Sequence, residues 1–107
     1  MRLVEFELGS KGDPIARIAD GRGRGKIGLP ARDWAKRHAL PKVGEAWVVE
    51  VEERENVCIL YPVLSPQQLE GLSLRFIRRG LNAGFPLDEV LAMAQKMRER
   101  EREAEVR

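Results

Sequence analysis

The sequence predicts a closed five-stranded β-barrel with a short helix between strands 3 and 4, followed by two C-terminal α-helices, an α+β protein overall. The prediction depends on a change of period near residue 65. Before it, short segments of β-forming residues alternate with turns rich in glycine and proline. After it, apolar residues recur at helical spacing. We therefore expect a small barrel over residues 1–64 and a helical extension over residues 65–107, packed on the barrel or projecting from it.

The first strand is expected over residues 2–8, which read RLVEFEL. Val4, Phe6 and Leu8 fall on one face of this segment and the glutamates fall on the other. A period of two is typical of a strand with one buried face. Residues 9–14 (GSKGDP) form a turn by composition.

The second and third strands are expected on either side of a glycine-rich loop. Residues 15–19 and 26–29 are short apolar segments, and residues 21–25 between them read GRGRG. Glycine accepts backbone angles that other residues resist, so we expect a tight and flexible loop.

A short helix is expected over residues 30–40, because this segment lacks glycine and begins with proline, which suits a first helical turn. Pro41 ends it. Residues 44–53 and 56–64 are rich in valine and other β-forming residues, which predicts two strands joined by a hairpin turn. Three strands, a helix and two strands is the order of an OB-type barrel, and closing the barrel leaves no strand edge exposed.

Two helices are expected near the C-terminus. Residues 67–79 carry apolar side chains at helical spacing, with Ser65 as the N-cap and Pro66 as the first helical residue. A break over residues 80–85 separates this helix from a second one over residues 86–107, which begins with an apolar stripe. Its last third has no apolar stripe, so we expect a solvated, fraying end stabilised by charge pairs four residues apart.

Composition narrows the class of protein. The 107 residues include 19 basic and 17 acidic side chains, so the net charge of +2 does not indicate a partner. The single cysteine, Cys58, excludes an internal disulfide and a multi-cysteine metal site. We expect a cytoplasmic protein without membrane contact, because the sequence lacks a signal-peptide layout and an apolar run of about 20 residues. We also expect no cofactor. Abundant arginine and glutamate without threonine indicate a thermophile or a high-GC genome.

Three short motifs lie in the first half: residues 12–18 (GDPIARI), residues 27–30 (IGLP) and residues 43–45 (VGE) before a valine-rich strand. They resemble the TRAM domain, a small OB-like barrel of RNA-modifying enzymes and stand-alone RNA-binding proteins, whose pattern is approximately GDGIARV, FVP and PGExVxV. The chain departs from the pattern by inserting residues 31–42 and by having Pro14 in place of a glycine. The resemblance covers residues 12–51, roughly half the chain, and implies binding to RNA or single-stranded nucleic acid.

The distribution of charge agrees with that implication. Residues 17–42 contain eight basic and two acidic residues, whereas residues 43–55 contain five glutamates and one arginine. A basic patch attracts phosphates through counterion release. The expected nucleic-acid-binding residues are Arg17, Arg22, Arg24, Lys26, Arg32, Trp34, Lys36 and Arg37. The alternative is that these are ordinary solvated charges, which the glutamates balance in the folded protein.

Aromatic residues are scarce where a single strand would bind. Stacking needs exposed rings on the barrel, and the second and third expected strands have none. Trp47 lies in a valine-rich strand and is expected in the core. Trp34, on the expected short helix, either caps the barrel or faces a ligand.

Residues 61–96 read YPVLSPQQLEGLSLRFIRRGLNAGFPLDEVLAMAQK. This segment resembles the later part of a MerR-family DNA-binding domain, whose pattern is approximately YRxYSxxDLxxLxFIxxxRxLGFSLxEIxxL. The helix-turn-helix of that family precedes this segment, and a β-rich half occupies its place here. The resemblance therefore implies a helix pair with a second basic patch of Arg75, Arg78 and Arg79, and a following helix used for dimerisation.

The turn between the two expected C-terminal helices, around Gly84 and Phe85, also has a purely structural interpretation. Gly84 would end one helix, Phe85 would pack against the start of the next, and Glu89 would lie near its N-terminus. A good connection between helices needs no further function to explain it.

Catalytic chemistry finds little support. His38 is the only histidine and Cys58 lies far from it in the sequence, on an expected strand. No spacing of ligands predicts zinc or another metal, and the GRGRGK run lacks the spacing and the Ser or Thr of a P-loop. We expect a protein that is not an enzyme and has no catalytic residue.

The sequence favours a protein that binds RNA or single-stranded nucleic acid through a basic loop and helix on a small barrel. The alternative is a protein-interaction or regulatory module that forms a homodimer or docks on a partner through residues 86–107. A DNA-associated transcription regulator that uses the MerR-like helices is the third possibility.

Overall fold

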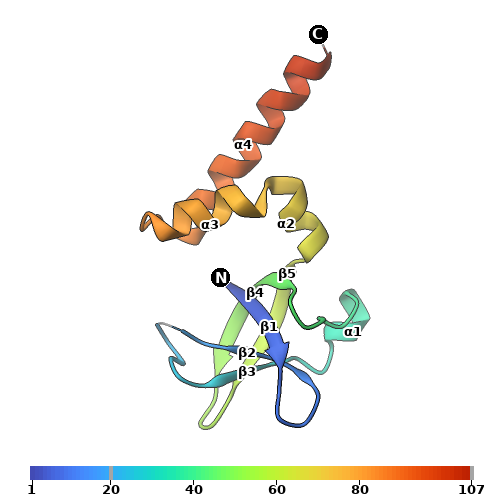
Figure 1. The fold of residues 1–107 in the computed structure, drawn as a ribbon, viewed down its shortest axis with the longest axis vertical. Coiled ribbons are helices and arrows are strands. Elements are labelled where there is room, and N and C mark those ends of the chain that lie inside the picture. Colours follow the sequence, from blue (N-terminus) through green and yellow to red (C-terminus); the bar gives the residue numbers. More distant parts are fainter. Residues whose placement is uncertain (20, 107) are drawn as a thin grey trace. The chain divides into compact units, whose positions relative to one another are not determined.

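The computed structural model describes residues 1–19 and 21–106. Asp20, which was counted in the basic segment, and Arg107, the expected end of the last helix, lie outside the described residues. The chain forms two compact units, Met1–Pro66 and Gln67–Arg107 (Figure 1). We describe each unit by itself.

The first unit is a closed barrel with the strand order β1-β2-β3-β5-β4. Its strands are β1 (Arg2–Leu8), β2 (Pro14–Arg17), β3 (Ile27–Pro30), β4 (Ala46–Glu53) and β5 (Cys58–Leu64). Antiparallel pairing of β1 with β4 closes the barrel, and β3 pairs with β5 in parallel. This topology, with its short helix between β3 and β4, confirms the predicted OB-like fold class.

The turns between strands follow from local sequence. Gly12 adopts a positive φ of 87°, which glycine tolerates, in the β1–β2 turn, and the Gly9 amide closes that turn on the Asp13 carbonyl at 2.9 Å. Arg54 donates its amide to the Val57 carbonyl at 2.9 Å, so the expected hairpin joins β4 to β5. Leu8 is exposed rather than buried with Val4 and Phe6, because it lies at the last position of β1 beside this turn.

The predicted helix over residues 30–40 is much shorter in the structure. Only α1 (Trp34–Arg37) is helical, one turn, and Pro30 belongs to β3. His38 has an extended backbone, with φ −143° and ψ 159°, which ends the helix before Pro41. The prediction overestimated the helix because proline suits a strand end as well as a first helical turn.

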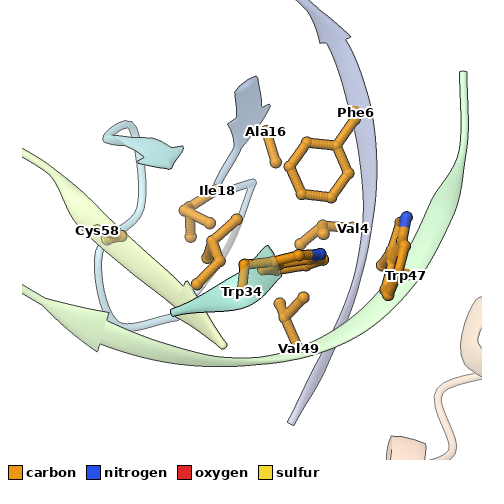
Figure 2. Packing of buried hydrophobic residues seen from close by; sticks show 9 residues of the cluster. Val4, Phe6, Ala16, Ile18, Trp34, Trp47, Val49 and Cys58 are labelled. Atoms are coloured by element: carbon orange, nitrogen blue, oxygen red, sulfur yellow. The ribbon is translucent and has the colours of Figure 1, made fainter. Parts of the chain in front are cut away.

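The core of the barrel is a cluster of nine buried side chains. Its members are Val4, Phe6, Ala16, Ile18, Trp34, Trp47, Val49, Cys58 and Leu60. Figure 2 shows the indole of Trp34 among Phe6, Val49 and Trp47. The rings of Phe6 and Trp47 pack edge-on against it, at centroid distances of 5.9 Å and 4.8 Å, a favoured geometry for aromatic pairs.

The second unit contains three helices where two were expected. The predicted helix over residues 67–79 is divided into α2 (Pro66–Leu72) and α3 (Leu74–Asn82). Ser73 separates them with a φ of 70°, a conformation that only a few per cent of residues other than glycine adopt. Its hydroxyl oxygen accepts the Phe76 amide at 3.3 Å and caps α3. The helical spacing of apolar residues continues across the break and therefore concealed it.

The connection from α3 to α4 (Leu87–Val106) is a Schellman motif. The Gly84 amide donates to the Leu81 carbonyl at 3.0 Å, and the Phe85 amide to the Gly80 carbonyl at 3.1 Å. Gly84 has a φ of 93°, as the expected end of a helix requires. Gly80 was predicted to break this helix but lies inside α3, where its missing side chain allows a close approach to Val90 of α4.

The end of α4 lacks the expected charge pairs. In the alternating sequence of residues 98–105, charged residues four apart carry the same sign of charge and opposite charges lie three apart, so pairs at i,i+4 would repel. No ion pair is present among the described side chains of residues 99–105. Arg98 instead reaches back along the unit and donates to the carbonyl oxygen of Gly71, at the end of α2. None of the described helices is long and apolar enough to cross a membrane.

Candidate nucleic-acid interface

The β2–β3 loop positions two arginines. Gly21, Gly23 and Gly25 all have positive φ angles, between 65° and 85°, and the Gly25 amide donates to the Ile18 carbonyl at 2.9 Å. Gly23 is buried, since a Cβ there would lie 2.5 Å from the sulfur of Cys58. The loop is therefore a compact turn in which Gly23 faces the barrel, while the side chains of Arg22 and Arg24 on either side of it are exposed.

Two of the expected phosphate-binding residues already have acidic partners. The Nε of Arg17 donates to Oε1 of Glu7 at 2.6 Å. The Nζ of Lys26 lies 3.2 Å from a carboxylate oxygen of Glu53 and donates to the Arg54 carbonyl at 2.7 Å. Both positive charges are thus partly neutralised, as the alternative interpretation of the basic segment expected.

The other five expected cations are different. They are Arg22, Arg24, Arg32, Lys36 and Arg37. Each is exposed, and none forms an ion pair or a side-chain hydrogen bond with a described residue. The first two lie in the loop before β3 and the other three in the segment after it, so they lie at opposite ends of that strand (Figure 1). We call the first two the loop cations and the other three the segment cations.

The segment cations depend on a buried tryptophan. Trp34 is 0% exposed, and its Nε1 donates to the Ala39 carbonyl at 3.0 Å. The ring of His38 packs edge-on against Trp47 at 5.6 Å. These contacts attach residues 31–42 to the barrel and leave the cations on the outside. Trp34 thus caps the barrel, the first of its two expected roles, and because no ring face is open to a base we remove it from the expected binding residues.

Between the two groups of cations, β3 exposes apolar side chains. Ile27 and Leu29 are 39% and 38% exposed, while Gly28 between them faces the Leu60 side chain in the core. The strand is short, since four residues at ~3.3 Å each span about 10 Å between the first and the last. The outer surface of β3 is therefore an apolar strip with, at both ends, positive side chains that have no ion-pair partner among the described residues.

Sequence reasoning missed one residue of this surface. Tyr61 on β5 is 36% exposed and is the only aromatic side chain of residues 1–66 that the structure leaves exposed among those it describes. The strand pattern could have identified it, because Cys58 and Leu60 are buried and alternation then places Ile59 and Tyr61 on the opposite face.

Tyr61 is coupled to an acidic neighbour. Its hydroxyl donates to Oε2 of Glu52 on β4 at 2.6 Å, and the Nε of Arg54 lies 3.5 Å from the other carboxylate oxygen. The hydrogen bond from Tyr61, reinforced by the charge of Arg54, lowers the pKa of Glu52. The same bond raises the pKa of the Tyr61 hydroxyl, and partial burial adds to the effect.

The predicted second basic patch lies on α3. Arg75 and Arg78 line a shallow hollow at the start of this helix together with Glu70 and Ser73, and Arg79 lies in its last turn. On α4, Met93 and Met97 are exposed one turn apart. A partner for this unit, whether DNA, another protein or a second copy, stays a prediction.

The groups considered for catalysis lie apart from a recognisable site. Cys58 is buried at 0% exposure in the barrel core, and His38 packs on Trp47. Within residues 1–19 and 21–106, no group of three or more His, Cys, Asp or Glu side chains is arranged to hold a metal ion. Comparisons with protein-family models, with curated proteins and with solved structures found no match to this chain.

Proposed function

We propose that the barrel binds single-stranded nucleic acid, RNA in particular, across the outer surface of β3. The single observation that carries the proposal is that two groups of exposed cations, without ion-pair partners in the described part of the chain, lie at the two ends of an exposed apolar strip. Phosphates are attracted to exposed arginine and lysine side chains, and the exposed aliphatic side chains of Ile27 and Leu29 offer apolar contacts to bases.

The topology supports this location. In OB-type barrels, the face of strands 2 and 3 and the loops beside it are the usual binding surface for oligonucleotides. The TRAM-like motifs agree with it as well: residues 12–18 form the β1–β2 turn and β2, residues 27–30 form β3, and residues 43–45 lead into β4. Three glutamates lie at or beside the β4–β5 hairpin: Glu52, Glu53 and Glu55. Because they repel phosphates, we expect the nucleic-acid backbone to follow the cations at the ends of β3 and to avoid the hairpin.

Fluorescence anisotropy with labelled single-stranded RNA, single-stranded DNA and duplex DNA, at low and moderate salt, tests the proposal. We expect single strands to bind more tightly than the duplex and binding to weaken as salt rises. The R22A/R24A double variant removes two phosphate contacts, so its affinity should fall on the order of tenfold at low salt, and its salt slope should fall by about 1.4, at ~0.7 per contact for single strands.

The R75A/R79A variant is the matched control, because it removes the same charge from the helical unit. It should leave affinity for single strands nearly unchanged. If R75A/R79A weakens binding and R22A/R24A does not, the helices are the nucleic-acid-binding surface and the barrel proposal is wrong. If the wild-type protein binds none of the three ligands at low salt, nucleic-acid binding itself is refuted.

A further inference from the structure

The outer surface of β4 and β5 holds an ordered set of polar side chains beside the apolar strip. The strand register pairs Leu29 with Ile59 and Ile59 with Glu52, so these three lie in one row across β3, β5 and β4. Tyr61 lies one pleat further along β5, on the same face. The strip of β3 therefore continues directly into the Tyr61–Glu52 pair.

Tyr61 is held in place from its hydroxyl end. The 2.6 Å bond to Glu52 fixes the ring relative to β4, and Arg54 holds the carboxylate of Glu52 from its other oxygen. An aromatic ring with an open face is what a base needs for stacking, and stacking by itself accepts every base. The neighbouring carboxylate and guanidinium are the groups that can discriminate among bases.

Glu52 can still accept hydrogen bonds. A carboxylate offers about four acceptor positions and no donor, and the described contacts of Glu52 are the Tyr61 hydroxyl and Arg54. Its side chain is 47% exposed. An acceptor beside the donors of Arg54 complements a base edge on which an amino group lies next to a ring nitrogen acceptor. Adenine and cytosine have this edge. Uracil has the reverse order, with its donor on the ring nitrogen N3 and its acceptors on the exocyclic oxygens, so a uracil whose exocyclic position faces Glu52 places a carbonyl oxygen against the carboxylate.

We propose that Tyr61, Glu52 and Arg54 form a base-reading site that selects adenine and cytosine over uracil. The inference rests on the proposed function, since it concerns a nucleic acid bound across β3. The phosphates then lie along the loop cations and the segment cations, and one base is placed over Tyr61 with its amino group directed at Glu52.

The test compares hexamers of adenylate, cytidylate and uridylate by anisotropy at one low salt concentration. The wild-type protein should bind the first two about five- to tenfold more tightly than the third. In the E52Q variant the side-chain amide donates as well as accepts, so the preference should disappear. The Y61L variant should weaken binding of all three hexamers.

The E55Q variant is the matched control, because it removes one negative charge from the same hairpin without touching the Tyr61–Glu52 pair. Its affinity for all hexamers should rise equally and its preference should persist. Equal affinity of the wild-type protein for the three hexamers, or an unchanged preference in E52Q, would overturn the base-reading site while leaving nucleic-acid binding intact. Absence of binding to every hexamer would refute the proposed function and the base-reading site together.

Discussion

Nine buried side chains form one cluster in the barrel unit, whereas in the described part of the helical unit the buried hydrophobic residues are Leu69, Ile77, Val90 and Ala94. In the barrel core, Phe6 and Trp47 each pack edge-on against Trp34. The helical unit depends more on individual backbone contacts: a cap at Ser73, a Schellman motif at Gly84 and the Arg98 bond to Gly71. The contrast indicates that buried apolar area stabilises the barrel and that local geometry stabilises the helices.

The strongest way to break this contrast is the W34A substitution. Removing the indole leaves a cavity at the centre of the barrel core and also removes the bond to the Ala39 carbonyl, so we expect the free energy of unfolding to fall by about 3–5 kcal/mol. Urea denaturation followed by far-UV circular dichroism and by Trp47 fluorescence measures the loss. The F85A variant is the control, because it truncates an aromatic residue that is 50% exposed in the helical unit. It should change stability by no more than ~0.5 kcal/mol, and equal losses in the two variants would refute the contrast.

An intermediate effect is expected at Ser73. The S73A variant loses the cap of α3 and keeps the unfavourable φ, so it should lose about 1 kcal/mol. Glycine also lacks the hydroxyl but adopts a φ of 70° without strain, and the S73G variant should stay within ~0.5 kcal/mol of the wild-type protein. Thermal melts of the three proteins give the order. A larger loss in S73G than in S73A would show that backbone strain at this junction has no energetic weight.

The smallest effect is expected from pH acting on the Tyr61–Glu52 pair. The pKa of Glu52 is lowered, so its hydrogen bond stabilises the folded protein fully at a pH above its ordinary pKa of 4.5. This stabilisation is lost as the pH falls through the lowered pKa. The pKa of Tyr61 is raised, so the same hydrogen bond stabilises the folded protein fully at a pH below the ordinary tyrosine pKa of 10.0. This stabilisation is lost as the pH rises through the raised pKa. The wild-type protein should therefore melt slightly above Y61F between those limits and coincide with it outside them. Because the pair is exposed the difference should be smaller than for S73A, and a difference independent of pH would exclude the hydrogen bond as its cause.

The barrel followed from the sequence more closely than the helices did. Strand alternation in residues 2–8 and the apolar and valine-rich segments predicted every strand end to within two residues, because one face of each strand is buried and alternation of apolar residues reflects that burial. The break at Ser73 left no comparable pattern. A single residue at positive φ changes the direction of the chain without changing the spacing of apolar residues, and serine is not a residue that predicts it.

The candidate interface was predictable only in part. Charge counting identified the segment that holds the unpartnered cations, but it could not separate Arg22 and Arg24 from Arg17 and Lys26, whose partners are far away in the sequence. Pairing of β1 with β2 brings Glu7 to Arg17. Closure of the barrel brings Glu53, the last residue of β4, to Lys26 just before β3. Tyr61 was overlooked for the same reason, since β5 becomes a neighbour of β3 only when the barrel closes.

The central claim is that nucleic acid binds across β3 between the loop cations and the segment cations. Titrating the isotope-labelled protein with a single-stranded RNA hexamer, and following the amide resonances by two-dimensional NMR, tests it most directly; a hexamer fits the ~4–16 nucleotides that one OB barrel accommodates. We expect the amide resonances of residues 21–37 and of Tyr61 to shift, while those of α3 and α4 keep their positions. Shifts confined to α3 and α4, or no shifts at low salt, would contradict it.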